Sequence, residues 1–247
     1  RDVTSLRYFA FNRSFMKISV KLADLPMEIG LQHDEYRFVF APFASEEPPM
    51  AFAAISPDEL VRAAAWYPEG GAAYAEMMEL CPRVSDALLP FGRLVFHALA
   101  FEWRGRVWLL TGPSGAGKTT HYLRWKLRYG EELRLLNGDK PLLEIPPEGA
   151  ITVHPSPWYG KEGMQQYFSG PLGGIILLEK AAENRMRRMT PREAAGCLFT
   201  QLLITRRACA LEQALLERTP LWLLQNRGDS AAAELCRDTL SKELTQL

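Results

Sequence analysis

The sequence lacks a long apolar run, an excess of charge of either sign and a closely spaced cysteine pair. Because a membrane-spanning helix needs ~20 consecutive apolar residues, we expect no membrane association. Acidic and basic residues number 29 each, so the formal net charge is zero. Proteins that neutralise many backbone phosphates usually carry a basic excess. We therefore expect no broad nucleic-acid binding, and at most a local basic pocket.

Cysteine and histidine are both scarce, with four residues of each. The cysteines at positions 81, 197, 209 and 236 form no CxxC pair and lie in apolar, helical-looking surroundings, which predicts buried free thiols in a reducing compartment. No signal-peptide pattern opens the chain, so we expect a cytoplasmic protein. The histidines and cysteines form no metal-ligand pattern. We expect His33, His121 and His154 to be structural.

What is present is an ordinary globular composition, with 247 residues of which 47% are apolar and 23% charged. In the first half, alternating apolar runs predict an antiparallel β meander at residues 7–12, 17–22, 36–41 and 51–56. Ser56, Pro57 and Glu59 form a helix-start signal. A second helix is expected over Ala72–Leu80, with Pro82 interrupting it.

The second half alternates expected strands and helices. Arg104-Gly105 predicts the turn of a hairpin whose second strand leads into a glycine-rich loop. The helix after the loop is expected to end near Tyr129 at Gly130. Two short strands around residues 137–141 follow, then a buried strand over 173–180. A capped helix from Thr190, a strand over 220–226 and a final helix capped by Asp229 or Ser230 complete the pattern.

The glycine-rich loop, residues 112–119, matches GxxxxGK(S/T) at every fixed position. Its glycines let backbone N–H groups turn inward towards phosphate oxygens, and the helix N-terminus adds a positive dipole end. Lys118 is a mobile charge for the β- and γ-phosphates, and the Thr119 hydroxyl is placed to ligate Mg²⁺. The expected nucleotide-binding residues are Gly112, Pro113, Ser114, Gly115, Ala116, Gly117, Lys118, Thr119 and Thr120. Within this set, Thr120 fits a first-turn helix residue better than a second metal ligand. The alternative for the whole loop is a glycine-rich turn with a solvated lysine.

Two residues near the loop are candidates for chemistry. Asp139 follows the expected strand after the loop helix, where P-loop proteins place an acid for Mg²⁺. It is therefore our candidate metal ligand or catalytic base, with an ordinary turn aspartate as the alternative. His97 is expected on the strand that precedes the loop strand, which places it beside the loop. The alternative there is a satisfied core histidine.

These residues together resemble the catalytic domain of HPr kinase/phosphorylase, a fold shared with the ATP-using phosphoenolpyruvate carboxykinases. The resemblance rests on His97-Ala98, the loop at 112–119 and Gly138-Asp139, and it covers residues 93–145. It implies an α/β fold with a P-loop mixed-sheet core, which we place at 91–247. The first ninety residues do not resemble the regulatory domain of the bifunctional enzymes, and we expect the β meander and helices at 1–90 to pack on the core. The chain is most similar to short stand-alone bacterial forms, some of which are associated with ribosomal-peptide biosynthesis.

What the resemblance implies about activity is an ATP- and Mg²⁺-dependent phosphotransferase, with Lys118, Asp139 and His97 as catalytic residues and Thr119 and Asp139 as metal ligands. The expected acceptor is a serine or threonine of a small protein or peptide. One departure matters: the family commonly has two aspartates where this chain has Gly138-Asp139. Either Asp139 serves the metal while His97 helps with the proton, or the base is missing. A nucleotide-binding accessory protein without phosphoryl transfer, or a small-molecule kinase, are the alternatives.

Other residues have open roles. Trp158, Tyr159 and Lys161 either close over a substrate or form a surface loop with one anchoring tryptophan. Lys140, directly after Asp139, either neutralises a phosphate or is solvated. The arginines are interpreted mainly as solvated helix charges, with one phosphate-binding arginine as the alternative; they stand at 185, 187, 188, 206 and 207. The acceptor, the choice between ATP and GTP and the oligomeric state are not determined by the sequence.

Overall fold

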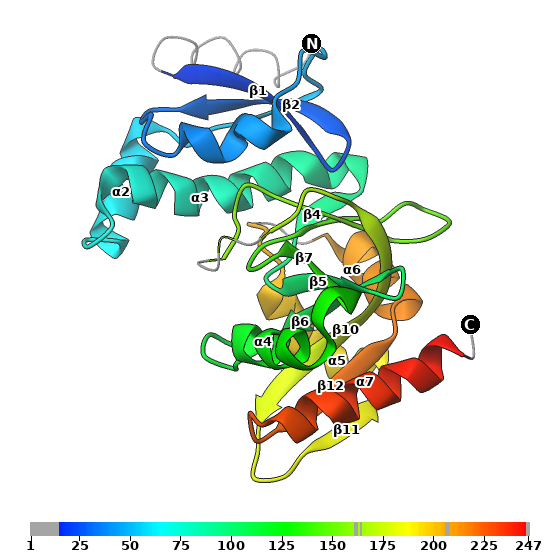
Figure 1. Ribbon diagram of the computed structural model, residues 1–247. Coiled ribbons are helices and arrows are strands. Elements are labelled where there is room, and N and C mark those ends of the chain that lie inside the picture. Colours follow the sequence, from blue (N-terminus) through cyan, green and yellow to red (C-terminus); the bar gives the residue numbers. More distant parts are fainter. Residues whose placement is uncertain (1–14, 161–162, 164, 206–207, 246–247) are drawn as a thin grey trace.

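The computed structural model describes residues 15–245, except residues 161, 162, 164, 206 and 207. It has a mixed α/β fold with a three-stranded sheet, a nine-stranded sheet and helices packed on both (Figure 1). The strand expected at 7–12 lies outside the described residues, as do Lys161, Arg206 and Arg207. The domain boundary expected near residue 90 stays a prediction.

The small sheet begins with a hairpin of β1 (Met16–Leu22) and β2 (Leu25–Leu31). Its two-residue turn consists of Ala23 and Asp24, which both have positive φ, 48° and 60°. Such a turn matches the right-handed twist of the two strands. The third strand, β3 (Ala51–Ala53), pairs with β2 in parallel, so the all-antiparallel meander is wrong at this strand.

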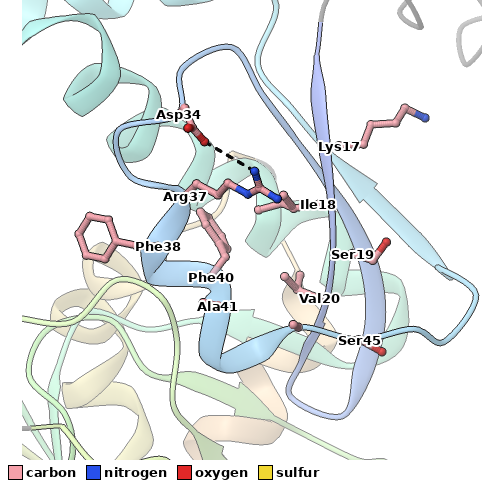
Figure 2. A pocket seen from close by; sticks show the side chains of 11 residues that line it. Lys17, Ile18, Ser19, Val20, Asp34, Arg37, Phe38, Phe40, Ala41 and Ser45 are labelled. Carbon is pink, nitrogen blue, oxygen red and sulfur yellow. Dashed lines mark ion pairs between the residues drawn. The ribbon is translucent and has the colours of Figure 1, made fainter.

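The segment expected as a strand at 36–41 is instead a 3₁₀ helix, η1 (Arg37–Phe43). Its buried residues are Val39, Phe40 and Phe43, a spacing that fits a helical turn and not the alternation of a strand. Pro42 lacks the N–H that a ladder would need. A hollow of about 650 Å³ lies between β1 and η1, and Figure 2 shows the Arg37 side chain extending from η1 towards Ile18 of β1 while it forms an ion pair with Asp34.

The helix-start signal at Ser56 is confirmed. The Ser56 side chain accepts a hydrogen bond from the Glu59 N–H, and Glu59 accepts one from the Ser56 N–H, at the start of α2 (Pro57–Trp66). The next helix, α3 (Gly71–Leu88), runs through Pro82, so the predicted interruption is wrong. An internal proline costs ~3 kcal/mol. The fully buried side chains on both sides of it, such as Leu80 and Val84, offset that cost because α3 packs between the two sheets (Figure 1).

The large sheet has the order β4-β8-β9-β10-β6-β5-β7, with β12 also paired to β10 and β11 paired to β12. Strands β6, β10 and β12 are parallel, whereas β5 and β6 form the predicted hairpin, with Arg104 and Gly105 both at positive φ. The strands are β4 (Arg93–Val95), β5 (Leu99–Trp103), β6 (Arg106–Thr111), β7 (Leu133–Asn137), β8 (Leu142–Glu144), β9 (Thr152–His154), β10 (Gly170–Lys180), β11 (Arg185–Arg188) and β12 (Leu221–Asn226).

Helices cover both faces of this sheet. On one face, α4 (Lys118–Tyr129) and α7 (Ser230–Leu244) pack on β5, β6, β7, β10 and β12. On the other, α5 (Pro191–Leu198) and α6 (Cys209–Arg218) do so. The predicted caps at Thr190 and Asp229 are confirmed, as is the end of α4 at Gly130. Short 3₁₀ helices complete the fold: η2 (Leu89–Phe91), η3 (Gly130–Glu132) and η4 (Phe199–Gln201).

The cysteine prediction is half right. All four thiols are free, and Cys81 and Cys236 are buried, but Cys197 and Cys209 are exposed because they lie on the outer sides of α5 and α6. None of the helices in the described part of the chain combines the length and the apolarity that a membrane span requires.

Trp158 anchors the segment that follows β9. This residue is 4% exposed, and its Nε1 donates to the Met77 carbonyl at 2.8 Å. Its ring meets the Phe40 ring edge-on, with 5.9 Å between the ring centroids. The interpretation of Trp158 as a residue that closes over a substrate is therefore wrong. The anchoring alternative is confirmed, because the side chain joins the segment after β9 to α3 and η1.

We expect Trp158→Ala to lower the free energy of unfolding by about 3–5 kcal/mol, because it removes a large buried side chain. Trp158→Phe keeps most of the packing and loses the hydrogen bond to Met77, so its effect is expected to be smaller. Urea unfolding followed by circular dichroism measures both. An alanine variant as stable as the wild type would show that Trp158 does not anchor this segment.

Candidate functional site

The phosphate-loop motif has the structural context that it requires. Strand β6 ends at Thr111 and α4 begins at Lys118, with residues 112–117 between them. Gly115 and Gly117 have φ of 76° and 95°, which side chains rarely tolerate. A Cβ atom on Gly112 would lie 2.9 Å from the Leu178 carbonyl oxygen of β10. The glycines are thus needed for the shape of the loop and for its close approach to the neighbouring strand.

Lys118 is folded back over this loop. The side chain is half-buried, and Nζ donates a hydrogen bond to the Gly112 carbonyl at 3.0 Å. Burial lowers the pKa of Lys118, while the negative charge of Asp139 acts in the opposite direction. The lysine of this turn is therefore not solvated, while its role in binding phosphate stays a prediction. The cap residue Gly117 has no side chain to accept the first N–H groups of α4, so those groups are available to an anion.

The other loop residues differ in accessibility. Pro113 and Ser114 are exposed, and Ala116 is buried. Thr119 is half-buried next to Lys118. Thr120 is exposed on the first turn of α4, which is what we expect of a helix residue that has no role in the loop.

Asp139 is positioned by a turn at the end of β7. The Asn137 Oδ1 accepts hydrogen bonds from the N–H groups of Asp139, at 2.9 Å, and Lys140, at 2.8 Å. Asn137 is fully buried, and its Nδ2 donates to the Ser156 hydroxyl at 3.2 Å. Sequence analysis missed this role of Asn137. The signal was available, because asparagine side chains commonly bond the backbone two residues further on.

His97 lies between β4 and β5, and not inside one strand as predicted, because the chain leaves β4 after Val95. It still reaches the predicted partner: Nε2 is 3.2 Å from Asp139 Oδ1. Its Nδ1 is 2.9 Å from Oε1 of Gln201, a residue that sequence analysis did not identify. Thr111, at the end of the loop strand, donates its hydroxyl to the His97 carbonyl at 2.9 Å. His97 and Asp139 are therefore in contact, and Lys118 lies within the electrostatic influence of Asp139, while the catalytic role of the three residues stays a prediction.

The charges of the site are closely paired. Burial would raise the pKa of Asp139, but the hydrogen bond from His97 and the charge of Lys140 outweigh it and lower this pKa to about 2. Lys140 forms an ion pair with Asp139 Oδ2, while His97 faces Oδ1. Both carboxylate oxygens already have partners, and Lys140 points into the site and not into solvent.

Arg185, Arg187 and Arg188 lie on strand β11, so the prediction that they belong to a helix is wrong. Their pairing places them away from the loop: Arg187 contacts Glu193 of α5 at 3.0 Å, and Arg188 lies over the Trp222 ring and pairs with Glu243 of α7. These contacts favour surface ion pairs, which contribute little to stability. Tyr159, next to the anchored Trp158, is half-buried.

No protein-family model and no curated protein matches the sequence. Among solved structures, the chain is similar to the Hpr(Ser) kinase/phosphatase from Coxiella burnetii, with 12% sequence identity and a TM-score of 0.36. That match covers 62% of this chain and 96% of the other. A TM-score at this level carries no argument, so the site is interpreted from its own geometry.

The lowered pKa of Asp139 has a consequence for stability against pH. Because the folded-state pKa is about 2, below the ordinary 3.8, the ionised carboxylate stabilises the fold above pH 4, and this contribution is lost as the pH falls towards 2. We expect the difference in free energy of unfolding between wild type and Asp139→Asn to shrink over that interval. Urea titrations at a series of pH values measure it, with exposed Asp34→Asn as the control. A difference independent of pH would contradict this assignment.

Proposed function

We propose that the chain is an ATP- and Mg²⁺-dependent phosphotransferase that acts on the hydroxyl of a serine or threonine in a small protein or peptide. The observation that carries the proposal is the half-buried Lys118 folded over the glycine loop, within the electrostatic influence of Asp139. The peptide acceptor is suggested by the resemblance of residues 93–145 alone.

The residues present fit a magnesium nucleotide. The close approach of Gly112 to Leu178 leaves no room for a side chain at this position, and the first N–H groups of α4 are available beside Lys118. Oxygen ligands suit Mg²⁺, and the chain offers them at Thr119 and Asp139. When bound, Mg²⁺ would neutralise charge on the phosphates. To ligate it, Asp139 would have to exchange Lys140 for the ion, which would free Lys140 to pair with a phosphate oxygen.

The reaction would then follow from positioning. The acceptor oxygen attacks the γ-phosphorus, the bond to the bridging oxygen of the β-phosphate breaks, and ADP leaves. Lys118 stabilises the negative charge that develops on the phosphoryl oxygens. The hydroxyl proton would pass to His97 Nε2 once this nitrogen has given up its hydrogen bond to Asp139 Oδ1, while Nδ1 keeps its bond to Gln201 Oε1.

A nucleotide-binding accessory protein without phosphoryl transfer is the second candidate, and a specific observation favours it. Both oxygens of Asp139 are held by His97 and Lys140, and Gly138 supplies no second carboxylate. Incubation with γ-labelled ATP and candidate acceptors separates the two functions. Nucleotide binding at one equivalent per chain without a labelled product favours the accessory protein.

Lys118→Ala tests the role of the loop. We expect phosphoryl transfer to fall by roughly 100-fold or more, because a charge that stabilises the transition state is lost. Lys126→Ala, which removes an exposed lysine from the same helix, is the matched control. Transfer rates come from a labelled-ATP assay, with circular dichroism to verify the fold. Undiminished transfer by Lys118→Ala would contradict the proposed role of Lys118 in phosphoryl transfer.

Gly138→Asp tests whether the missing second carboxylate limits the reaction. Gly138 is not among the glycines with positive φ, so its φ does not oppose a side chain. We expect the variant to transfer phosphate roughly tenfold or more faster, because a positioned base typically contributes that much or more. Gly138→Asn has the same size without the charge. If Asn raises the rate as much as Asp, or if neither does, the carboxylate is not the limiting feature.

A further inference from the structure

Three potential metal ligands from distant parts of the sequence meet outside the nucleotide site. Asp24 lies in the turn between β1 and β2 of the small sheet, Glu144 is the last residue of β8, and His154 is the last residue of β9. One ligand atom from each of them lies within 4.8 Å of the other two. Their separation in sequence explains why spacing alone did not reveal them.

The distance between two of the three ligand atoms suits a shared cation, and the third atom lies within 4.8 Å of both. Ligand atoms that surround a zinc ion tetrahedrally, at about 2.1 Å from it, are about 3.4 Å from one another. His154 Nε2 is 3.3 Å from Glu144 Oε2, close to this value and longer than the usual N–H···O hydrogen bond of about 2.9 Å. The Asp24 carboxylate completes a set of one nitrogen and two oxygens.

The ligands are oriented by second partners, as in known metal sites. The Ser169 hydroxyl is 2.9 Å from His154 Nδ1, which leaves Nε2 facing Glu144. Arg93 holds the other oxygen of Glu144 at 2.6 Å and also donates to the Ala23 carbonyl at 2.6 Å.

Space for a further ligand lies next to the three residues. A hollow of about 170 Å³ is lined by Asp24, His154 and Ser169, with Phe43 and Tyr167 among its apolar walls. A zinc site with three protein ligands keeps its fourth position for water or another small donor.

We propose that Asp24, Glu144 and His154 bind one divalent transition-metal ion, with Zn²⁺ as the best match, and that this ion joins the β1–β2 turn of the small sheet to strands β8 and β9 of the large sheet. Imidazole together with carboxylate suits zinc better than it suits magnesium, whose ligands are mainly oxygens. The site is thus separate from the Mg²⁺ expected at the phosphate loop. The competing explanation is an ion-pair network without a metal.

The experiment measures Zn²⁺ binding by calorimetry without nucleotide, so its outcome does not depend on the proposed phosphotransferase. The full chain carries Cys197→Ser and Cys209→Ser, because exposed thiols also bind zinc. We expect one zinc ion per chain and a rise in Tm on binding. Asp24→Asn is the main variant, since asparagine tolerates the left-handed conformation of this turn and the fold should persist.

Asp24→Asn is expected to weaken zinc binding by roughly tenfold or more, and Ser169→Ala by roughly tenfold through the loss of a partner that orients His154. Asp34→Asn is the matched control, because Asp34 is an exposed aspartate that follows β2 of the same small sheet. This variant should bind zinc like the parent chain. Absence of one-to-one binding by the parent chain overturns the proposal. Undiminished binding by Asp24→Asn does so as well, because the ion would then lie elsewhere.

Discussion

The parallel pairing of β6 with β10 is the constraint on which the rest of the site depends. It brings the end of β6 against β10, where Gly112 meets the Leu178 carbonyl so closely that no side chain fits. The chain must turn away there, and it does so through glycines in left-handed conformations before α4 begins. In open α/β sheets, ligands bind at the carboxyl ends of parallel strands. The loop, the helix N-terminus and Lys118 occupy that edge.

The charged residues beside the loop are held by neutral ones. The buried Asn137 shapes the turn that carries Asp139 and Lys140, and Gln201, from the segment after α5, holds the far nitrogen of His97. Such partners reduce the conformational freedom of catalytic side chains, which helps to position them for a reaction. The same arrangement keeps Asp139 ionised and paired, so a cation that ligates Asp139 would have to displace Lys140 from it.

The small sheet is attached to the core by side chains from both. Trp158 inserts among residues of η1 and α3, and Arg93 of β4 donates to the Ala23 carbonyl in the β1–β2 turn. The proposed metal site lies at this same turn. An ion there would stabilise the attachment in a way that depends on metal concentration, because binding to the folded state alone raises stability by mass action.

Local chemistry in the sequence determined the phosphate-loop motif, the hairpin at Arg104-Gly105 and the helix caps at Ser56, Thr190 and Asp229, because each depends on residues within a few positions of one another. It also suggested that His97 and Asp139 lie near the loop. Only the tertiary structure decided the helix through Pro82, the 3₁₀ helix over Arg37–Phe43 and the burial of Trp158. In each of these, packing against distant segments outweighs local preference. The meeting of Asp24, Glu144 and His154 belongs to the same class, since it needs both the pairing of β8 with β9 and the placement of the β1–β2 turn of the other sheet beside them.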